Sequence, residues 1–265
     1  MSGAALALVL AAAVLHATWN RVLHGATDRL AAAALGAAVG AVLLMPATIT
    51  APPVHAWPAA LASGAAEAAY FGFLAAAYRR GELSITYPVA RGIAPFLITL
   101  GGAAVLGQSL TAARIGGSLA LGVGLAIISQ AGLARGRGLA MTFAALTGIT
   151  IAVYSVIDAG AVRSADAIGY LGAVTAVQAV ILLSAVRLDR ARLRAAAPAG
   201  AGIGVGSVAA YLLVLLAYQR APASPVATLR ELSILLGILV ARDRPGKRVW
   251  LGGALCVFGA ALTVV

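Results

Sequence analysis

The chain has 265 residues, of which 62% are hydrophobic and only 10% are charged, and its mean hydropathy is +0.99. A soluble domain carries about 25% charged residues because its surface must be wetted, so this composition excludes a soluble globule and predicts an integral membrane protein. The net charge of +11 would suggest nucleic acid in a soluble protein, but no basic patch is interleaved with aromatic residues, so we expect no nucleic-acid partner.

Ten apolar stretches follow one another along the sequence, each long enough to cross a bilayer as a helix. They lie near residues 3–22, 30–50, 58–78, 86–106, 112–130, 138–158, 167–186, 199–218, 224–241 and 248–265. No Lys or Arg precedes the first stretch, so we interpret it as a retained transmembrane helix and not as a signal peptide. The connections are too short for a soluble domain, and the sequence therefore predicts an all-α membrane fold with ten transmembrane helices.

Basic residues are distributed unevenly between alternate connections. Fourteen of the 19 Lys and Arg residues fall at connections that follow the odd-numbered stretches, three fall on the opposite side, and Arg91 and Arg230 lie within stretches. Short loops rich in Lys and Arg stay in the cytoplasm. We therefore expect a multi-pass protein of the cytoplasmic (inner) membrane, with both termini outside.

The two halves of the sequence resemble each other at a separation of about 139 residues. Residues 68–91 and 209–230 both run from Ala-Ala-Tyr through Ala-Tyr-x-Arg to an Arg in the next stretch. We interpret residues 1–134 and 135–265 as two five-helix repeats, and because five is odd, the second copy would be inverted in the membrane. Inverted repeats are typical of secondary transporters, whose substrate site lies near the midplane between the repeats.

Ionisable residues within the stretches are the first candidates for a transport site, because a charge in hydrocarbon usually faces a partner or a wet cavity. They are Glu67, Arg91, Asp158, Arg230 and Glu231. Glu67 shares a helical face with Tyr70. Its carboxyl group could take up a proton as the site closes, since burial disfavours the charged form; the alternative is a structural ion pair with Arg91 or Arg230.

Arg91 follows Tyr87 by about one helical turn and lies between two prolines, which are tolerated where a helix lines a cavity. A guanidinium group there would bind a substrate carboxylate through two parallel hydrogen bonds. Arg230 is its equivalent in the second repeat, and for both arginines the alternative is a purely structural ion pair. Glu231 should not pair directly with Arg230, because adjacent helical residues point about 100° apart.

Two further pairs of polar residues are equivalent in the two repeats. His16 and Asn20 are four residues apart, as are Tyr154 and Asp158, and Trp19 adjoins the first pair. Each pair predicts a polar stripe on one helix face. These stripes either line the cavity or its gate, with His16 or Asp158 exchanging protons, or anchor the helices at the lipid headgroups.

The chain resembles the EamA-like family of the drug/metabolite transporter superfamily over essentially its whole length. Residues 81–129 have a Ser-x-x-x-Pro entry, a mid-helix Pro95 and a glycine-rich following helix, and they resemble the family's fourth and fifth helices. Residues 221–265 repeat this pattern more loosely, and HATWN at 16–20 is similar to the family's first helix. The resemblance implies a ten-helix fold that moves small metabolites, often amino acids or drug-like solutes, sometimes by proton exchange.

These observations predict a secondary transporter of small amino-acid-like or drug-like solutes that works by alternating access, with protons as a candidate coupling ion. The expected partners are the substrate and the lipid bilayer; the oligomeric state is unknown from the sequence. The sequence contains no catalytic motif, metal-ligand cluster or nucleotide-binding signature, so we expect no enzyme activity, no metal and no cofactor. The alternatives are a non-transporting membrane scaffold or sensor and, less favoured, an intramembrane enzyme.

Overall fold

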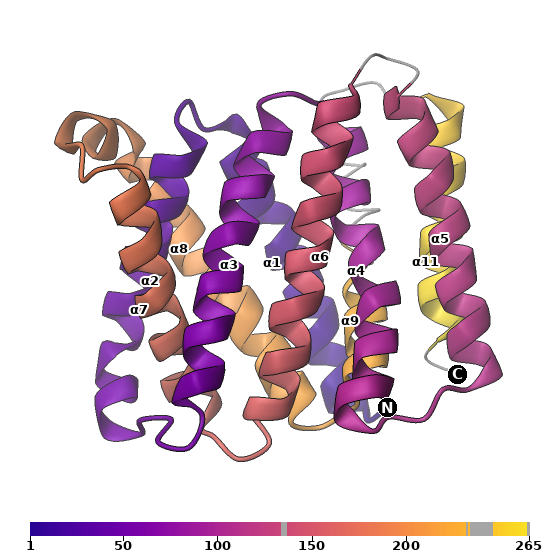
Figure 1. The fold of residues 1–265 in the computed structure, drawn as a ribbon, viewed down its shortest axis with the longest axis horizontal. Coiled ribbons are helices and arrows are strands. Elements are labelled where there is room, and N and C mark those ends of the chain that lie inside the picture. The colour runs from indigo at the N-terminus through magenta and orange to yellow at the C-terminus, as the bar shows by residue number, and fades with distance from the viewer. Residues whose placement is uncertain (134–136, 232, 234–245, 264–265) are drawn as a thin grey trace.

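The computed structural model describes residues 1–133, 137–231, 233 and 246–263, and within these residues the chain is helical and contains no strand. The helices are α1 (Gly3–Gly25), α2 (Arg29–Thr50), α3 (Trp57–Tyr78), α4 (Leu83–Leu106), α5 (Ala112–Leu133), α6 (Gly138–Ala161), α7 (Ala167–Ala185), α8 (Arg190–Tyr218), α9 (Ala223–Arg230) and α11 (Lys247–Leu262). They run side by side in alternating directions, with both termini at the same end of the bundle (Figure 1).

Seven of the described helices are long and apolar enough to cross a membrane: α1, α2, α3, α4, α6, α7 and α8. The chain is therefore compatible with a multi-pass membrane protein, as the composition predicts. The ninth expected span, near 224–241, is described through α9 and at Glu231 and Ser233, and its remaining residues lie outside the described part of the chain. Arg135, Arg242 and Arg244 of the expected basic connections also lie outside it.

The start of α8 differs from the expected start near residue 199. The helix begins at Arg190, because the carboxylate of Asp189 accepts hydrogen bonds from the backbone N–H groups of Ala191 and Arg192 and so caps the helix. The first turns of α8 contain several charged residues, so a search for apolar stretches does not detect them. The added turns carry arginines beyond the apolar part of α8.

The two halves of the sequence interleave in space. Among the described helices, the extensively packed pairs α1–α8, α2–α7, α2–α8, α3–α6, α3–α7, α4–α6 and α5–α11 each join residues 1–134 to residues 135–265. Of the helices that the structure describes, only α4 and α5 form an extensive pair within one half. The proposed repeats are therefore not two separate bundles, since each half packs chiefly against the other.

The described helices fall into two sets. We group α1, α2, α3, α6, α7 and α8 as the six-helix set and α4, α5, α9 and α11 as the four-helix set, although α4 also packs extensively on α6. Figure 1 shows α5 and α11 at one edge of the molecule. The two sets meet mainly where α4 packs on α6 and α9 packs on α1. This boundary between the sets is where the candidate site is built.

Small residues let α2 and α7 approach closely, as is common where lipid supplies no hydrophobic force between helices. A Cβ atom on Gly169 would overlap the backbone carbonyl oxygen of Ala51 at the end of α2. The hydroxyl of Thr48 donates a hydrogen bond of 3.3 Å to the carbonyl of Gly169 at the same contact. Glycine at position 169 is therefore needed for α2 and α7 to pack at this short distance.

Gly169→Ala is expected to destabilise the protein by about 1–3 kcal/mol, because the new methyl group must push two backbones apart. Gly202→Ala is the matched control. A Cβ there meets nothing within 4 Å, and alanine favours a helix over glycine by up to about 1 kcal/mol, so this variant should be unchanged or more stable. Thermal unfolding in detergent measures both, and equal changes in melting temperature would contradict the close contact.

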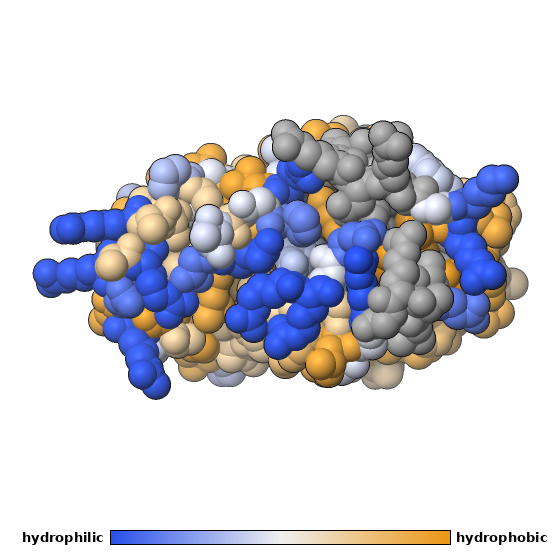
Figure 2. Space-filling model, turned by 90° about the horizontal axis from the view of Figure 1, so that it is seen from above, coloured by the Kyte–Doolittle hydropathy of each residue, from blue (hydrophilic) through white to orange (hydrophobic). Residues whose placement is uncertain are grey.

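Hydrophilic residues gather at one end of the bundle, seen from above in Figure 2, where the α1–α2, α3–α4 and α7–α8 connections emerge (Figure 1). Two ion pairs lie at this arginine-rich end, Arg192 Nε to Asp28 Oδ2 and Arg137 Nη2 to Glu82 Oε1, both 2.7 Å long. The hydrogen bond from Arg192 lowers the pKa of Asp28, so this pair persists at neutral pH. The first pair joins α8 to the start of α2, and the second joins the starts of α6 and α4.

Candidate functional site

The predicted site residues are all buried, although they come from helices that are otherwise apolar. Arg91, Asp158, Arg230 and Glu231 are at most 1% exposed. The other buried members are His16, Trp19, Asn20, Glu67, Tyr70, Tyr87 and Tyr154. Because burying a charge is costly unless it is paired or faces a polar cavity, these side chains mark the polar interior of the molecule.

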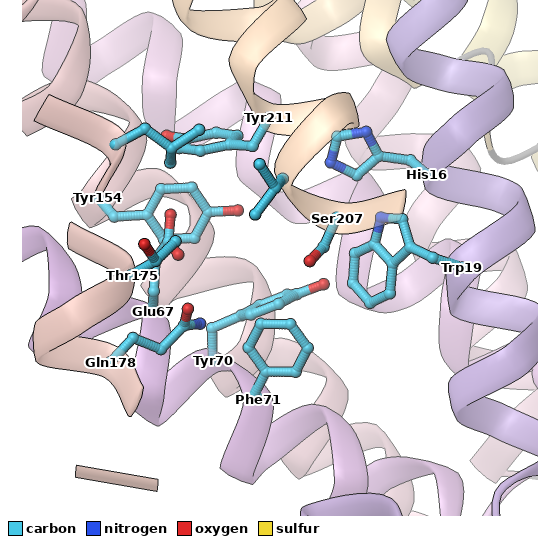
Figure 3. A pocket seen from close by; sticks show the side chains of 12 residues that line it. His16, Trp19, Glu67, Tyr70, Phe71, Tyr154, Thr175, Gln178, Ser207 and Tyr211 are labelled. Carbon is cyan, nitrogen blue, oxygen red and sulfur yellow. The ribbon is translucent and has the colours of Figure 1, made fainter. Parts of the chain in front are cut away.

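Five of the predicted residues line one small cavity inside the six-helix set. They are His16, Trp19, Glu67, Tyr70 and Tyr154. The cavity has a volume of about 30 Å³, which is enough for one or two water molecules. Figure 3 shows side chains from α1, α3, α6, α7 and α8 converging on this space, so both halves of the sequence contribute to its walls.

Further residues that line the cavity are not among the candidates identified from the sequence. They include Phe71, Thr175, Gln178, Ser207 and Tyr211. Two signals in the sequence identify part of this group: Tyr211 matches Tyr70 in the repeated Ala-Ala-Tyr segment, and Thr175 and Gln178 are three residues apart on one helix. Neither signal says which helices meet around the cavity.

Aromatic rings form a continuous row along the cavity. The ring of Trp19 lies 5.5 Å from that of Phe71, and Tyr70 contacts Phe71 at 4.9 Å, edge to face. Tyr154 continues the row, 6.0 Å from Tyr70 and 5.4 Å from Tyr211 between ring centres. Such walls accept an apolar or planar group and present hydroxyl groups at their edges.

Asp158 is fixed by two tyrosines from neighbouring helices. The hydroxyl of Tyr170 on α7 donates to Asp158 Oδ1 at 2.6 Å, and the hydroxyl of Tyr211 on α8 donates to Oδ2. Asp158 is therefore behind the cavity wall and orients Tyr211, which lines the cavity. The arrangement makes Asp158 a positioning residue that joins α6, α7 and α8.

Asn20 occupies a comparable position on α1. Its side-chain Oδ1 accepts a hydrogen bond of 3.0 Å from the hydroxyl of Tyr78 on α3, and its Nδ2 donates to the carbonyl of His16 at 2.8 Å. Asn20 thus joins α1 to α3 as Asp158 joins α6 to α8. Both of the predicted polar stripes lie in the protein interior, where each makes a contact between helices.

Tyr170→Phe is expected to cost more stability than Tyr78→Phe. The first change removes a bond to a carboxyl group and the second removes a bond to a neutral amide, although both tyrosines are buried. Hydrogen bonds to charged groups contribute about 1.5–3 kcal/mol, against about 0.5–1.5 kcal/mol for neutral pairs. Unfolding measurements on the two variants compare them, and a larger loss for Tyr78→Phe would contradict the anchoring of Asp158.

Arg91 and Glu231 form a buried ion pair across the four-helix set. Arg91 Nη2 on α4 lies 3.3 Å from Glu231 Oε1 at the end of α9, and both side chains are at most 2% exposed. The structural alternative considered for Arg91 is thus present, with Glu231 as its partner. Among the described residues, neither arginine forms an ion pair with Glu67.

Arg230 is buried without a hydrogen-bond or ion-pair partner in the part of the chain that the structure describes. It is 0% exposed, and none of its three guanidinium nitrogens has a hydrogen-bond partner among the described residues. It lies in the last turn of α9, which Glu231 caps through a backbone bond to the carbonyl of Thr228, so the negative end of the helix dipole gives it only partial compensation. Its electrostatic neighbours include Tyr154, Tyr211 and Tyr218, two of which line the cavity.

The site therefore has two parts on opposite sides of the boundary between the helix sets. The six-helix set supplies the cavity with His16, Glu67 and the aromatic row. The four-helix set supplies the Arg91–Glu231 pair and the unpartnered Arg230. Among the described residues no group of His, Cys, Asp and Glu side chains could hold a metal ion.

Comparisons with known proteins show the fold and leave the activity open. No protein-family model matches the sequence, and no curated protein matches it. A chain in a solved crystal structure is similar to this one with a TM-score of 0.67 and 21% sequence identity, over 99% of this chain and 96% of the other. At this identity the similarity shows that the fold as a whole occurs in another protein.

Proposed function

We propose that this protein is a secondary transporter of small metabolites in the cytoplasmic membrane. One observation carries the proposal: the cavity and the charges beside it lie in the interior of apolar, membrane-length helices and are built from both halves of the sequence. Ionisable residues placed in this way typically mark the path of a solute or an ion. The sequence resemblance to EamA-like transporters supports the same proposal.

The proposed architecture is ten membrane-spanning helices in two inverted repeats, residues 1–134 and 135–265. The helix packing supports it. In two equivalent repeats, each helix corresponds to the helix five places later, with α11 counted as the tenth. Contacts should then occur in matching pairs. The pair α1–α8 matches α6–α3, α2–α8 matches α7–α3, and α4–α6 matches α9–α1, and all of these pairs are in contact. Asp28 and Asp166, which cap α2 and α7, also occupy matching positions.

The proposed orientation places the arginine-rich end in the cytoplasm and both termini outside. The even-numbered gaps between helices carry few basic residues, and short basic loops remain on the cytoplasmic side. The sequence has no nucleotide-binding signature, so the energy for transport would come from a solute or ion gradient, with protons as the candidate ion. His16 and Glu67 are the cavity residues that would exchange them.

The moving parts in this proposal are the two helix sets, and not the two halves of the sequence. The halves interleave through nearly all of their extensive contacts, whereas the two sets meet through one extensive pair, α4–α6, and through a smaller contact of α9 with α1. His16 and Glu67 lie on one side of this boundary, and Arg91, Arg230 and Glu231 lie on the other. Separation of the sets at either end would open the space between these groups to one side of the membrane.

Purified protein in liposomes tests the proposal. Vesicles filled with a mixture of small metabolites are diluted into buffer with or without a pH gradient, and the retained solutes are measured by mass spectrometry. The proposal expects release of a limited class of solutes, faster than from protein-free vesicles, and a change in that rate with the pH gradient if protons are coupled. Equal retention of every solute in both kinds of vesicle would overturn it.

A further inference from the structure

The unpartnered cation Arg230 indicates which chemical group the transported solute carries. Among the described residues the guanidinium of Arg230 has no hydrogen bond and no ion pair. Such a buried group is energetically costly, and it normally binds a carboxylate or phosphate through two parallel hydrogen bonds. Arg91, by contrast, already has Glu231. One positive charge in the interior is thus available to a ligand.

The hydroxyl of Tyr218 on α8 adds a second donor beside it. Tyr218 is 3% exposed, and it is an electrostatic neighbour of Arg230. Its hydroxyl lies near that of Ser155 but makes no hydrogen bond of good geometry among the described residues. A guanidinium and a phenol together match the two oxygens of one carboxylate. Tyr154 and Tyr211 neighbour Arg230 as well and also line the cavity, so a group bound at Arg230 would have its body at the aromatic row.

The charges around Arg230 favour a singly charged anion. Glu231 is the next residue, and Glu67 and Asp158 are within electrostatic range of Arg230. These carboxyl groups would repel the second negative charge of a phosphate ester, because like charges in a poorly solvated interior interact strongly. A monocarboxylate neutralises Arg230 without adding excess negative charge.

We propose that Arg230 and Tyr218 bind the carboxylate of a monoanionic solute, and that its planar or apolar body enters against Tyr154 and Tyr211 when the two helix sets separate, because the cavity as described has room for one or two waters. The inference rests on the proposed function in one respect, since it takes the ligand to be the transported solute. The site itself is a binding site and can be measured without transport.

Intrinsic fluorescence of Trp19, which lines the cavity, provides the readout. Trp57 and Trp250 are each 41% exposed and are replaced by Phe, so that Trp19 is the sole tryptophan of the chain. The purified protein is titrated in detergent with phenylacetate, with its neutral analogue phenylacetamide, and with phenyl phosphate. We expect the fluorescence to change saturably with phenylacetate, and we expect phenylacetamide and phenyl phosphate to bind at least tenfold more weakly. A tenfold ratio in affinity corresponds to about 1.4 kcal/mol, which is less than a bidentate charged contact contributes.

Arg230→Gln should abolish the preference for phenylacetate over phenylacetamide, and Tyr218→Phe should reduce it. Both variants must elute as single species and unfold cooperatively, and Arg230→Lys, which keeps the charge, should retain a part of the preference. Equal binding of the acid and the amide, no saturable response to phenylacetate, or an unchanged preference in Arg230→Gln would overturn the inference.

The two proposals fail in different ways. Protein that prefers phenylacetate but releases no solute from liposomes would contradict transport and leave the carboxylate site standing. Protein that releases solutes but shows no preference for the acid would contradict the carboxylate site alone.

Discussion

Arg91→Met is expected to destabilise the protein by about 3–5 kcal/mol, because removal of one partner leaves the other buried and charged. Glu231 is 0% exposed, and Arg91 is its ion-pair partner among the described residues. Methionine is similar to arginine in length but has no charge. The loss of stability therefore measures mainly the loss of the ion-pair partner of Glu231, and only to a small extent a loss of packed volume. Unfolding in mixed detergent, followed by fluorescence or circular dichroism, gives the difference in free energy.

Arg230→Met provides the matched control, with the same substitution at a neighbouring buried arginine. No hydrogen bond or ion pair with a described residue is lost there, and a buried charge disappears, so stability should be unchanged or increased. The double variant Arg91→Met with Glu231→Leu should recover most of the loss, since both members of the pair are then apolar. Similar losses for Arg91→Met and Arg230→Met would contradict the unequal partnering of the two arginines.

A cross-link between positions 82 and 137 is expected to block transport. Glu82 precedes α4 in the four-helix set, and Arg137 precedes α6 in the six-helix set, with 2.7 Å between their charged atoms. In a Cys256→Ala background, a thiol cross-linker joining E82C to R137C would hold the two sets together at the arginine-rich end. Solute flux should fall to the level of protein-free vesicles and return when the cross-linker is cleaved.

D28C with R192C is the control for this experiment. That ion pair has the same length and lies at the same end of the bundle, but it joins α2 to α8 within the six-helix set. Both cysteine pairs connect residues 1–134 to residues 135–265. If the two sequence halves were the moving bodies, both cross-links would block flux; if the two helix sets move, only the first will do so.

The sequence predicts the helices well because a run of apolar residues long enough for a bilayer has few alternatives to a helix. It fails at the start of α8, where Asp189 caps a helix whose first turns are rich in arginine. The sequence does not predict that the two halves interleave either. A repeat in sequence indicates similar units, whereas the packing between α2 and α7 or α3 and α6 depends on shape and on close contacts such as the one at Gly169.

Burial of the candidate residues could be anticipated from the cost of placing charges in lipid, and all of them are buried. Their partners could not be anticipated, because partners are set by helices distant in sequence. Arg91 and Arg230 look equivalent in the sequence, yet Arg91 has Glu231 and Arg230 has no partner among the described residues. Asp158 likewise depends on Tyr170 and Tyr211, which come from two other helices.

Counterflow tests alternating access most directly. Liposomes containing the protein are loaded with an unlabelled metabolite mixture and diluted into the same solutes at low concentration in isotopically labelled form, without any ion gradient. A carrier with a single site that faces one side at a time exchanges solute, so we predict transient accumulation of a labelled solute above its outside concentration. Labelled solute that only equilibrates, or that does not enter, would contradict the proposed mechanism.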